Sequence, residues 1–179
     1  MNIVELLESK KEKKYHLLPL SYSFEGLSPI LNKQNIIWHY NFHSKGYEKK
    51  ANEQNDTFSI AGLFLHNIWW SILSNPKKNN KPELETNNLI NKNFVSFSNF
   101  KNEFTERAAA TKGSQWVAFL KSGKIVIIDK HKIIKNIILL LDCWEHSWYP
   151  TYGPNKNKYI KNYWKIINWN EVEKRLQTK

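Results

Sequence analysis

The residues best suited to metal chemistry are three histidines and one aspartate in three separate segments. His39 begins the segment HYNFHSKGY, and His66 lies in an otherwise apolar segment. Asp142 and His146 follow the apolar run NIILLLD. An unpaired carboxylate is costly to bury, and three imidazoles with one carboxylate suit a transition metal such as iron or manganese. A lone buried histidine is more often a hydrogen-bonded core residue, so residue types alone leave both interpretations open.

Two helices must position the first two histidines. Apolar and aromatic residues recur at three- and four-residue intervals over residues 27–52, which predicts one long helix. His43 and Tyr47 follow His39 at intervals of one helical turn, so all three side chains can face the same way. After a polar break, the segment FSIAGLFLHNIWWSIL is apolar on every side, which predicts a deeply buried second helix. Together they would form a helical hairpin.

The rest of the chain mixes helices and strands. Residues 75–88, NPKKNNKPELETNN, contain two prolines and many polar residues, which predicts a linker. A helix capped by Ser98 should follow. Three β-prone runs then predict strands at residues 116–120, 124–129 and 135–142, the first two as a hairpin. A break at Gly153-Pro154 precedes further helical pattern. We therefore expect an α+β fold, with an N-terminal helical hairpin lobe (residues 1–80) packed on a C-terminal lobe (residues 81–179) that holds a small antiparallel sheet.

Along most of its length the sequence resembles the iron/manganese superoxide dismutase family. The opening motif of the family resembles LPLSYSFEGLSP, and its two helical ligand motifs resemble WHYNFHSKGY and HNIWWSIL. The match continues in order through FKNEFTERAAATKGSQW, DCWEHSWYPTY and YIKNYWKIINWNEV. Since all six motifs occur in the family's order, the resemblance is specific.

The resemblance implies roles for particular residues. The family's metal ligands would be His39, His66, Asp142 and His146, holding one iron or manganese ion per chain. Its substrate-gateway tyrosine would be Tyr47, with His43 beside it. Residues reaching the partner subunit's site would be Glu145 and Tyr149, and the aromatic walls of the metal site would be Trp70, Trp116 and Trp144. A dimer with itself or with a homologous chain is implied as well.

The sequence also departs from the family pattern. Family members carry a glutamine that hydrogen-bonds the solvent on the metal, just before the second ligand in iron enzymes or on the β-hairpin in manganese enzymes. Those places are expected to hold Gly62 and Val126, neither of which can donate this bond. The resemblance therefore predicts weak activity that Val126→Gln would raise. The Tyr47–His66 interval and the hairpin are also shorter than usual, as expected if the fold had been recruited into a larger assembly.

Composition limits the other possibilities. The chain has 179 residues, a net charge of +11 and a single cysteine, Cys143, which cannot form an intrachain disulfide. No run approaches the roughly 18 apolar residues of a membrane span, so no membrane partner is expected. The first residues contain three glutamates and show no import signal. We expect an intracellular protein, in the mitochondrion or the cytoplasm.

Two functions are consistent with the sequence. The first is a superoxide dismutase, in which the positive field draws the superoxide anion inward. The second is a non-catalytic relative in the small subunit of the mitochondrial ribosome, in contact with rRNA and ribosomal proteins. Residues 81–179 carry seventeen Lys or Arg against nine Asp or Glu. A solvated surface is the more ordinary explanation of these lysines.

Overall fold

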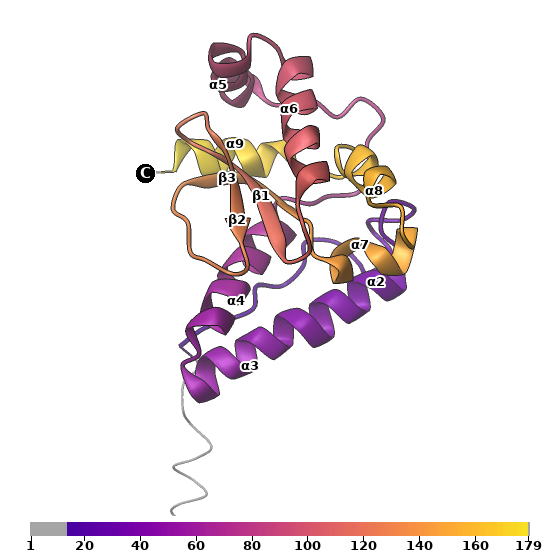
Figure 1. The fold of residues 1–179 in the computed structure, drawn as a ribbon, viewed down its shortest axis with the longest axis vertical. Coiled ribbons are helices and arrows are strands. Elements are labelled where there is room, and N and C mark those ends of the chain that lie inside the picture. The colour runs from indigo at the N-terminus through magenta and orange to yellow at the C-terminus, as the bar shows by residue number, and fades with distance from the viewer. Residues whose placement is uncertain (1–13, 179) are drawn as a thin grey trace, which may run out of the picture.

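The computed structural model describes residues 14–178. One long helical segment runs beneath the rest of the molecule in Figure 1. It consists of α2 (Lys33–Trp38), a π-helical turn η1 (His39–Ser44) and α3 (Lys45–Gln54). The segment begins later than the predicted residue 27, because Asn32 caps it by accepting a hydrogen bond from the Asn35 backbone at 2.8 Å.

The second predicted helix is α4 (Thr57–Ser71), and it packs antiparallel to α3 after a short polar turn. Asp56 caps it by accepting hydrogen bonds from the backbone and the hydroxyl of Ser59. Nine of its residues are buried, as its all-round apolar character predicts. The helical hairpin is therefore confirmed.

Three antiparallel strands form one sheet in the order β2-β1-β3. They are β1 (Gln115–Leu120), β2 (Ile125–Asp129) and β3 (Ile137–Asp142). All six residues of β3 are buried, because α4 and α9 both contact this strand. The predicted α+β class, the hairpin and the third strand are confirmed.

Helices surround the sheet. They are α5 (Leu84–Phe94), α6 (Phe97–Ala110), α7 (Glu145–Tyr152), α8 (Lys156–Tyr163) and α9 (Trp169–Gln177). The predicted linker was too long, because its last residues form the start of α5. There Glu173 accepts hydrogen bonds from the Glu85 and Thr86 backbones. The cap of α6 is Ser96 rather than Ser98. The boundary near residue 80 lies between α4 and α5, and the two-lobe division stays a prediction.

One hydrophobic core joins the hairpin to the sheet. Its largest fully buried side chains include Trp69, Trp70, Trp116 and Trp169. Because α4 contacts β3, His66 of α4 lies close to Asp142, the residue that ends β3. Within residues 14–178, no helix is both long enough and apolar enough to cross a membrane.

Candidate metal centre

His39 is the first residue of the π-helical turn η1, and its side chain is fully buried. Such π-turns, with hydrogen bonds between residues five apart, are frequent at functional sites. Here the Ser44 hydroxyl donates to the His39 carbonyl at 3.0 Å, and Trp70 Nε1 donates to Ser44 Oγ at 3.0 Å. The turn that presents His39 is thus connected to α4.

His66 projects from the middle of α4 and is also fully buried. Its Nδ1 lies 2.6 Å from the carbonyl oxygen of Gly62, one turn earlier. A carbonyl only accepts hydrogen bonds, so Nδ1 carries the proton and Nε2 keeps its lone pair. This is the arrangement in which a backbone carbonyl orients a metal-binding imidazole.

Asp142 ends β3, and His146 follows one turn later on α7. Asp142 Oδ1 accepts a hydrogen bond from the Trp144 backbone at 2.9 Å, which leaves Oδ2 facing the histidines. The buried Asn35 of α2 donates from Nδ2 to the His146 carbonyl at 3.3 Å. Both residues are therefore fixed by neighbouring elements.

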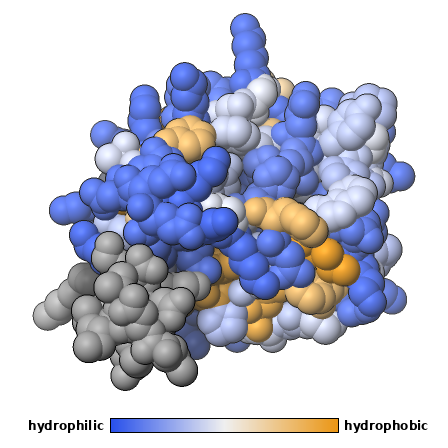
Figure 2. Space-filling model, turned by 90° about the horizontal axis from the view of Figure 1, so that it is seen from below, coloured by the Kyte–Doolittle hydropathy of each residue, from blue (hydrophilic) through white to orange (hydrophobic). Residues whose placement is uncertain are grey.

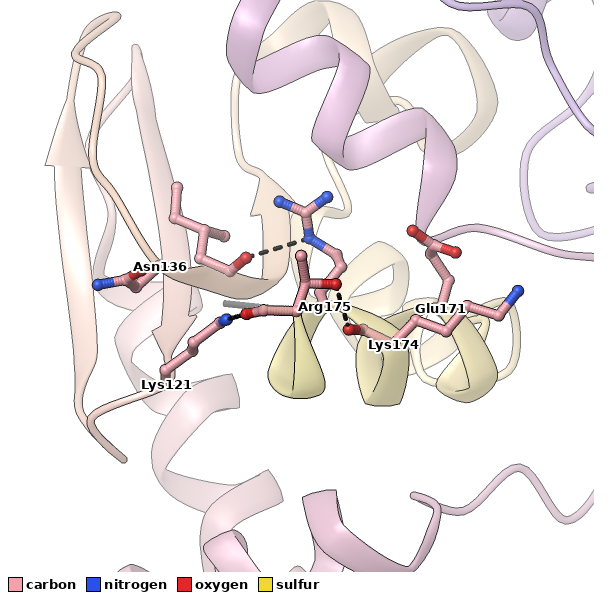
Figure 3. Close-up of a pocket in the computed structure, with 7 residues that line it drawn as sticks. Lys121, Asn136, Glu171, Lys174 and Arg175 are labelled. Atoms are coloured by element: carbon pink, nitrogen blue, oxygen red, sulfur yellow. Dashed lines mark hydrogen bonds between the residues drawn. The ribbon is translucent and has the colours of Figure 1, made fainter.

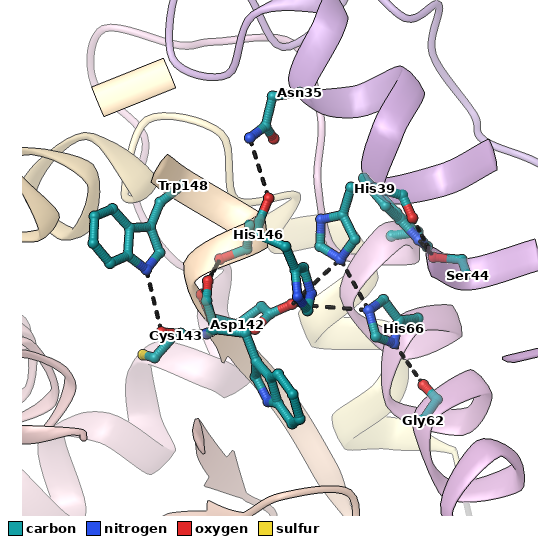
Figure 4. Close-up of polar contacts among 12 residues, drawn as sticks. Asn35, His39, Ser44, Gly62, His66, Asp142, Cys143, His146 and Trp148 are labelled. Atoms are coloured by element: carbon teal, nitrogen blue, oxygen red, sulfur yellow. Dashed lines mark hydrogen bonds and ion pairs between the residues drawn. The ribbon is translucent and has the colours of Figure 1, made fainter. Parts of the chain in front are cut away.

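The four side chains converge on one point (Figure 4). One donor atom from each of His39, His66, Asp142 and His146 lies within 4.8 Å of the others. Asp142 Oδ2 is 3.4 Å from Nε2 of both His39 and His146, and it has no hydrogen-bond partner of ordinary geometry. His146 Nε2 has none either. Buried polar atoms are normally satisfied, and a cation among these donors would satisfy them. The residues present thus fit a single transition-metal ion.

The electrostatics of the cluster favour lone pairs over protons. Burial and the nearby His146 lower the pKa of His39 to about 3, and burial lowers that of His66 well below its usual value. Burial alone would raise the pKa of Asp142, but contacts with His146 and His39 outweigh it and lower the pKa overall. Neutral imidazoles and an ionised carboxylate are the forms that bind metal.

Comparison with known proteins identifies the relatives of this chain. A sequence model for the C-terminal domain of iron/manganese superoxide dismutases matches residues 82–175. The iron superoxide dismutase of Saccharolobus solfataricus is 34% identical over 92% of this chain and 94% of its own length. The chain belongs to the iron/manganese superoxide dismutase family. Other relatives include the iron enzyme of Pyrobaculum aerophilum, 31% identical over 92% of this chain and 93% of its own, and a manganese enzyme of Haloferax volcanii, 28% identical over 91% and 96%.

The aromatic residues predicted to wall the site all lie against ligands. The ring centre of Trp70 is 4.8 Å from that of His39, and Trp116 is 5.0 Å from His66. Trp144 is half-buried, with its ring centre 5.6 Å from that of His146. Apolar rings at these positions keep water from the ligands and lower the local dielectric.

The other residues implied by the family occupy the outer side of the cluster. Tyr47 lies with its ring centre 5.1 Å from that of His66, and the ring of His43 stacks on His146 at 4.4 Å. Glu145 and Tyr149 lie at the start of α7 and are exposed in the single chain. Their roles across a subunit interface stay predictions.

His131 is a residue of the site that sequence reasoning missed. It follows β2 and is 6% exposed, and neither ring nitrogen has a hydrogen-bond partner of ordinary geometry. Its ring centre is 4.8 Å from that of Tyr47 and 5.8 Å from that of His66. Burial lowers the pKa of His131 to about 4, against smaller opposing effects of Asp142 and the Phe58 backbone. A buried neutral imidazole therefore adjoins the predicted ligand cluster and Tyr47.

The presence of His131 explains why residue 62 is glycine. A Cβ atom on Gly62 would come within 2.5 Å of His131 Nδ1 and 2.8 Å of its Cε1. The imidazole thus fills the space that a side chain at position 62 would need. His131 is thus a polar side chain beside the cluster that the sequence analysis did not include. No sequence signal relates it to residue 62, because the two residues lie in separate segments and meet only in the folded chain.

Val126, the predicted place of the hairpin glutamine, pairs with Ala118 inside the sheet and packs against the hydrophobic core. Gln115, at the start of β1, donates from Nε2 to Asp129 at 3.4 Å and accepts a hydrogen bond from the Lys112 backbone. The polar group of the hairpin region that reaches the site comes instead from the loop after β2.

Proposed function

We propose that this protein is a superoxide dismutase with one iron or manganese ion held by His39, His66, Asp142 and His146. The observation that carries the proposal is the convergence of these four buried donors in a chain of this family. A bound ion of either metal supplies one-electron redox chemistry, which oxidises one superoxide to dioxygen and reduces the next to peroxide. The net charge of +11 favours the approach of this anion.

The protein's own task in this reaction is to position protons. Burial, with Asp142 nearby, raises the pKa of Tyr47 to about 12, so its hydroxyl keeps its proton at neutral pH. His131 lies against Tyr47 and has two ring nitrogens without partners. We propose that His131 takes the role of the family's glutamine. In this proposal Tyr47 and His131 together position the proton that is donated when peroxide forms. The earlier expectation of weak activity is thereby replaced by one of ordinary dismutase activity.

We propose further that two chains pair through the surface around Glu145 and Tyr149. Tyr149 is 52% exposed, and Phe42, 67% exposed, adds an apolar side chain from η1. Figure 2 views the face beneath the long helix and shows a cluster of hydrophobic residues within a largely hydrophilic surface. Mass measurement by light scattering should give a dimer for the native chain and a monomer for Glu145→Ala/Tyr149→Ala.

The proposed activity is tested by metal analysis combined with superoxide consumption on the purified protein. We expect about one iron or manganese ion per chain and catalytic loss of superoxide, which disappears after chelation and returns with metal. A protein that takes up stoichiometric metal but does not consume superoxide would contradict the proposal.

The role of His131 is tested by two variants at that position and one control variant. His131→Gln supplies a different hydrogen-bonding group and should retain activity, whereas His131→Val should lose about 100-fold in kcat at unchanged metal content. Val126→Gln serves as the control and should have little effect, because that side chain packs in the core. Equal activity of the His131 variants would show that the imidazole only fills space.

The alternative, a non-catalytic subunit of the mitochondrial ribosome, has no observation among residues 14–178 that favours it. We therefore propose superoxide dismutase activity and not the ribosomal role. Recovery of the native protein only in an RNA-containing particle, without metal, would reverse this preference.

A further inference from the structure

A basic surface lies around α8, and none of the predicted metal ligands lines it. Two hollows of about 450 and 210 Å³ adjoin there and share Asn162 and Lys165 among their lining residues. We call them together the α8 groove. Six lysines line it: Lys77, Lys78, Lys101, Lys158, Lys161 and Lys165.

No carboxylate lines the α8 groove. The sequence contains no Asp or Glu between Glu145 and Glu171, and none between Asp56 and Glu83. Among the contacts of these lysines, the Lys165 ammonium donates to Asn162 Oδ1 at 3.0 Å, and Lys101 lies 5.5 Å from the ring centre of Trp164. These neighbours are neutral. The charge of the groove is therefore not balanced by its own lining.

The shape of the groove is fixed by hydrogen bonds to backbone carbonyls and not by contacts between its charged side chains. Asn80 donates from Nδ2 to the carbonyls of Trp164 at 3.0 Å and Ile167 at 2.7 Å. The Lys77 backbone donates to the Lys165 carbonyl at 2.8 Å. These bonds fix the segment after α4 against the end of α8. The lysines of the two segments thus face one another on a defined scaffold.

Helix stability does not explain the lysines at the start of α8. Cations are favourable near the C-terminus of a helix and unfavourable near its N-terminus. Lys156 and Lys158 lie in the first turn of α8, which has no acidic residue. Lys158 and Lys161 are three residues apart on α8, where like charges repel. The arrangement is locally unfavourable and becomes favourable when an anion is bound.

Another basic hollow in the molecule differs from the α8 groove in the partners of its charged side chains (Figure 3). It is lined by Lys121, Lys174 and Arg175, but also by Glu171. Arg175 Nε donates to the Ile137 carbonyl at 3.1 Å, and the Lys121 ammonium donates to the Thr178 carbonyl. Two of its three cations thus already have partners within the protein. The α8 groove is the better candidate for an external anion.

We propose that the α8 groove binds the phosphate backbone of a nucleic acid without sequence specificity. The two adjoining hollows offer consecutive cation sites, as a chain of phosphates requires. None of the large apolar side chains of residues 14–178 that are markedly exposed lines either hollow, which disfavours insertion into a membrane. Trp164 is buried and Tyr152 half-buried, so bases have little ring surface on which to stack.

The proposal is tested with the metal-loaded full chain and a fluorescent duplex DNA of about 20 base pairs, in parallel with an RNA strand of equal length. Binding is measured by anisotropy over a range of salt concentrations. Lys161→Gln/Lys165→Gln removes two charges from the groove. Lys49→Gln/Lys50→Gln removes two exposed charges from α3, far from α8 in Figure 1.

We expect the groove variant to bind about tenfold more weakly, with the slope of log affinity against log salt reduced by about 1 per lysine. The α3 variant should keep the native slope. Superoxide consumption should be native in both variants, which shows that they are folded. Tighter binding of DNA or of RNA would identify which of these backbones is bound.

Three results would overturn the proposal. Equal weakening in both variants would mean that only net charge matters. Complete competition by inorganic phosphate, with no dependence on strand length, would mean a site for a small anion. Binding to vesicles of phosphatidylcholine and phosphatidylserine, without binding to either nucleic acid, would mean a membrane surface.

Discussion

The ligand cluster and the pocket of His131 lie side by side but are built differently. Each predicted ligand belongs to a regular element or its end, and His66 is oriented within α4 by the hydrogen bond from its Nδ1 to the Gly62 carbonyl. His131 comes from the loop after β2 and is positioned by packing against Gly62 and the rings of Tyr47 and Phe58. Neither of its nitrogens has a hydrogen-bond partner of ordinary geometry.

The difference shows which parts of such a site can change. Metal binding needs four donors at one point, so a ligand cannot move without loss of the ion. The group beside the ion only has to deliver a nitrogen or oxygen to the right place, whichever segment supplies it. By the proposal above, a loop histidine next to a glycine meets that requirement in this chain.

The largest effect should follow from changing a ligand. Asp142→Asn keeps the size of the side chain but removes its charge, and we expect at least about 100-fold weaker metal binding. Metal analysis, and thermal unfolding with and without chelator, would measure it, because metal that binds only the folded state raises Tm. Asp129→Asn, at the exposed end of β2, is the matched control. Native metal content in Asp142→Asn would remove Asp142 from the ligand set.

A smaller effect should follow from disturbing the His131 pocket alone. Gly62→Ala places a Cβ against the imidazole and displaces it, while the backbone carbonyl that orients His66 is retained. We expect about tenfold lower kcat at native metal content. Gly46→Ala on α3 meets no atom within 4 Å and is the control. If Gly62→Ala lost its metal instead, the two regions would not be separable.

Asn35 tests how firmly the cluster depends on its supports. Asn35→Leu removes the donor to the His146 carbonyl, and also a buried amide oxygen that has no partner. The two losses offset each other, so the free energy of unfolding should change by less than about 1 kcal/mol. The rate of metal loss to a chelator should rise a few-fold. An unchanged rate would mean that His146 is positioned without Asn35.

The smallest effect concerns a carboxylate far from the metal. Burial would raise the pKa of Glu173, but hydrogen bonds from Thr86 and Glu85 lower it overall. A lowered folded-state pKa means that its stabilisation is present above the unfolded pKa and is lost as pH falls through the folded value. Glu173→Gln should therefore lower the free energy of unfolding at pH near 7 by about 1 kcal/mol, allowing for solvent screening. Urea unfolding should show this difference vanish below the pKa of Glu173, and a difference that persists there would contradict the assignment.

Much of the fold could be predicted because its signals are local. The spacing of apolar residues predicted the hairpin and the three strands, and the motif WHYNFHSKGY indicated the first ligand. The predictions that were wrong concern ends of elements: the start of the long helix, the cap of α6 and the length of the linker. Several polar residues can act as caps at these places, and packing decides among them.

The sequence by itself determined the types and the order of the predicted ligands, through motifs that occur in the family's order, and the elements that carry them, because those elements show their own periodicity. Only the tertiary structure decided that His131 lies against Gly62 and that Lys77 and Lys101 meet the lysines of α8. These residues lie far apart in the chain, and no periodicity relates them. Their proximity is set by the way several elements pack around one core.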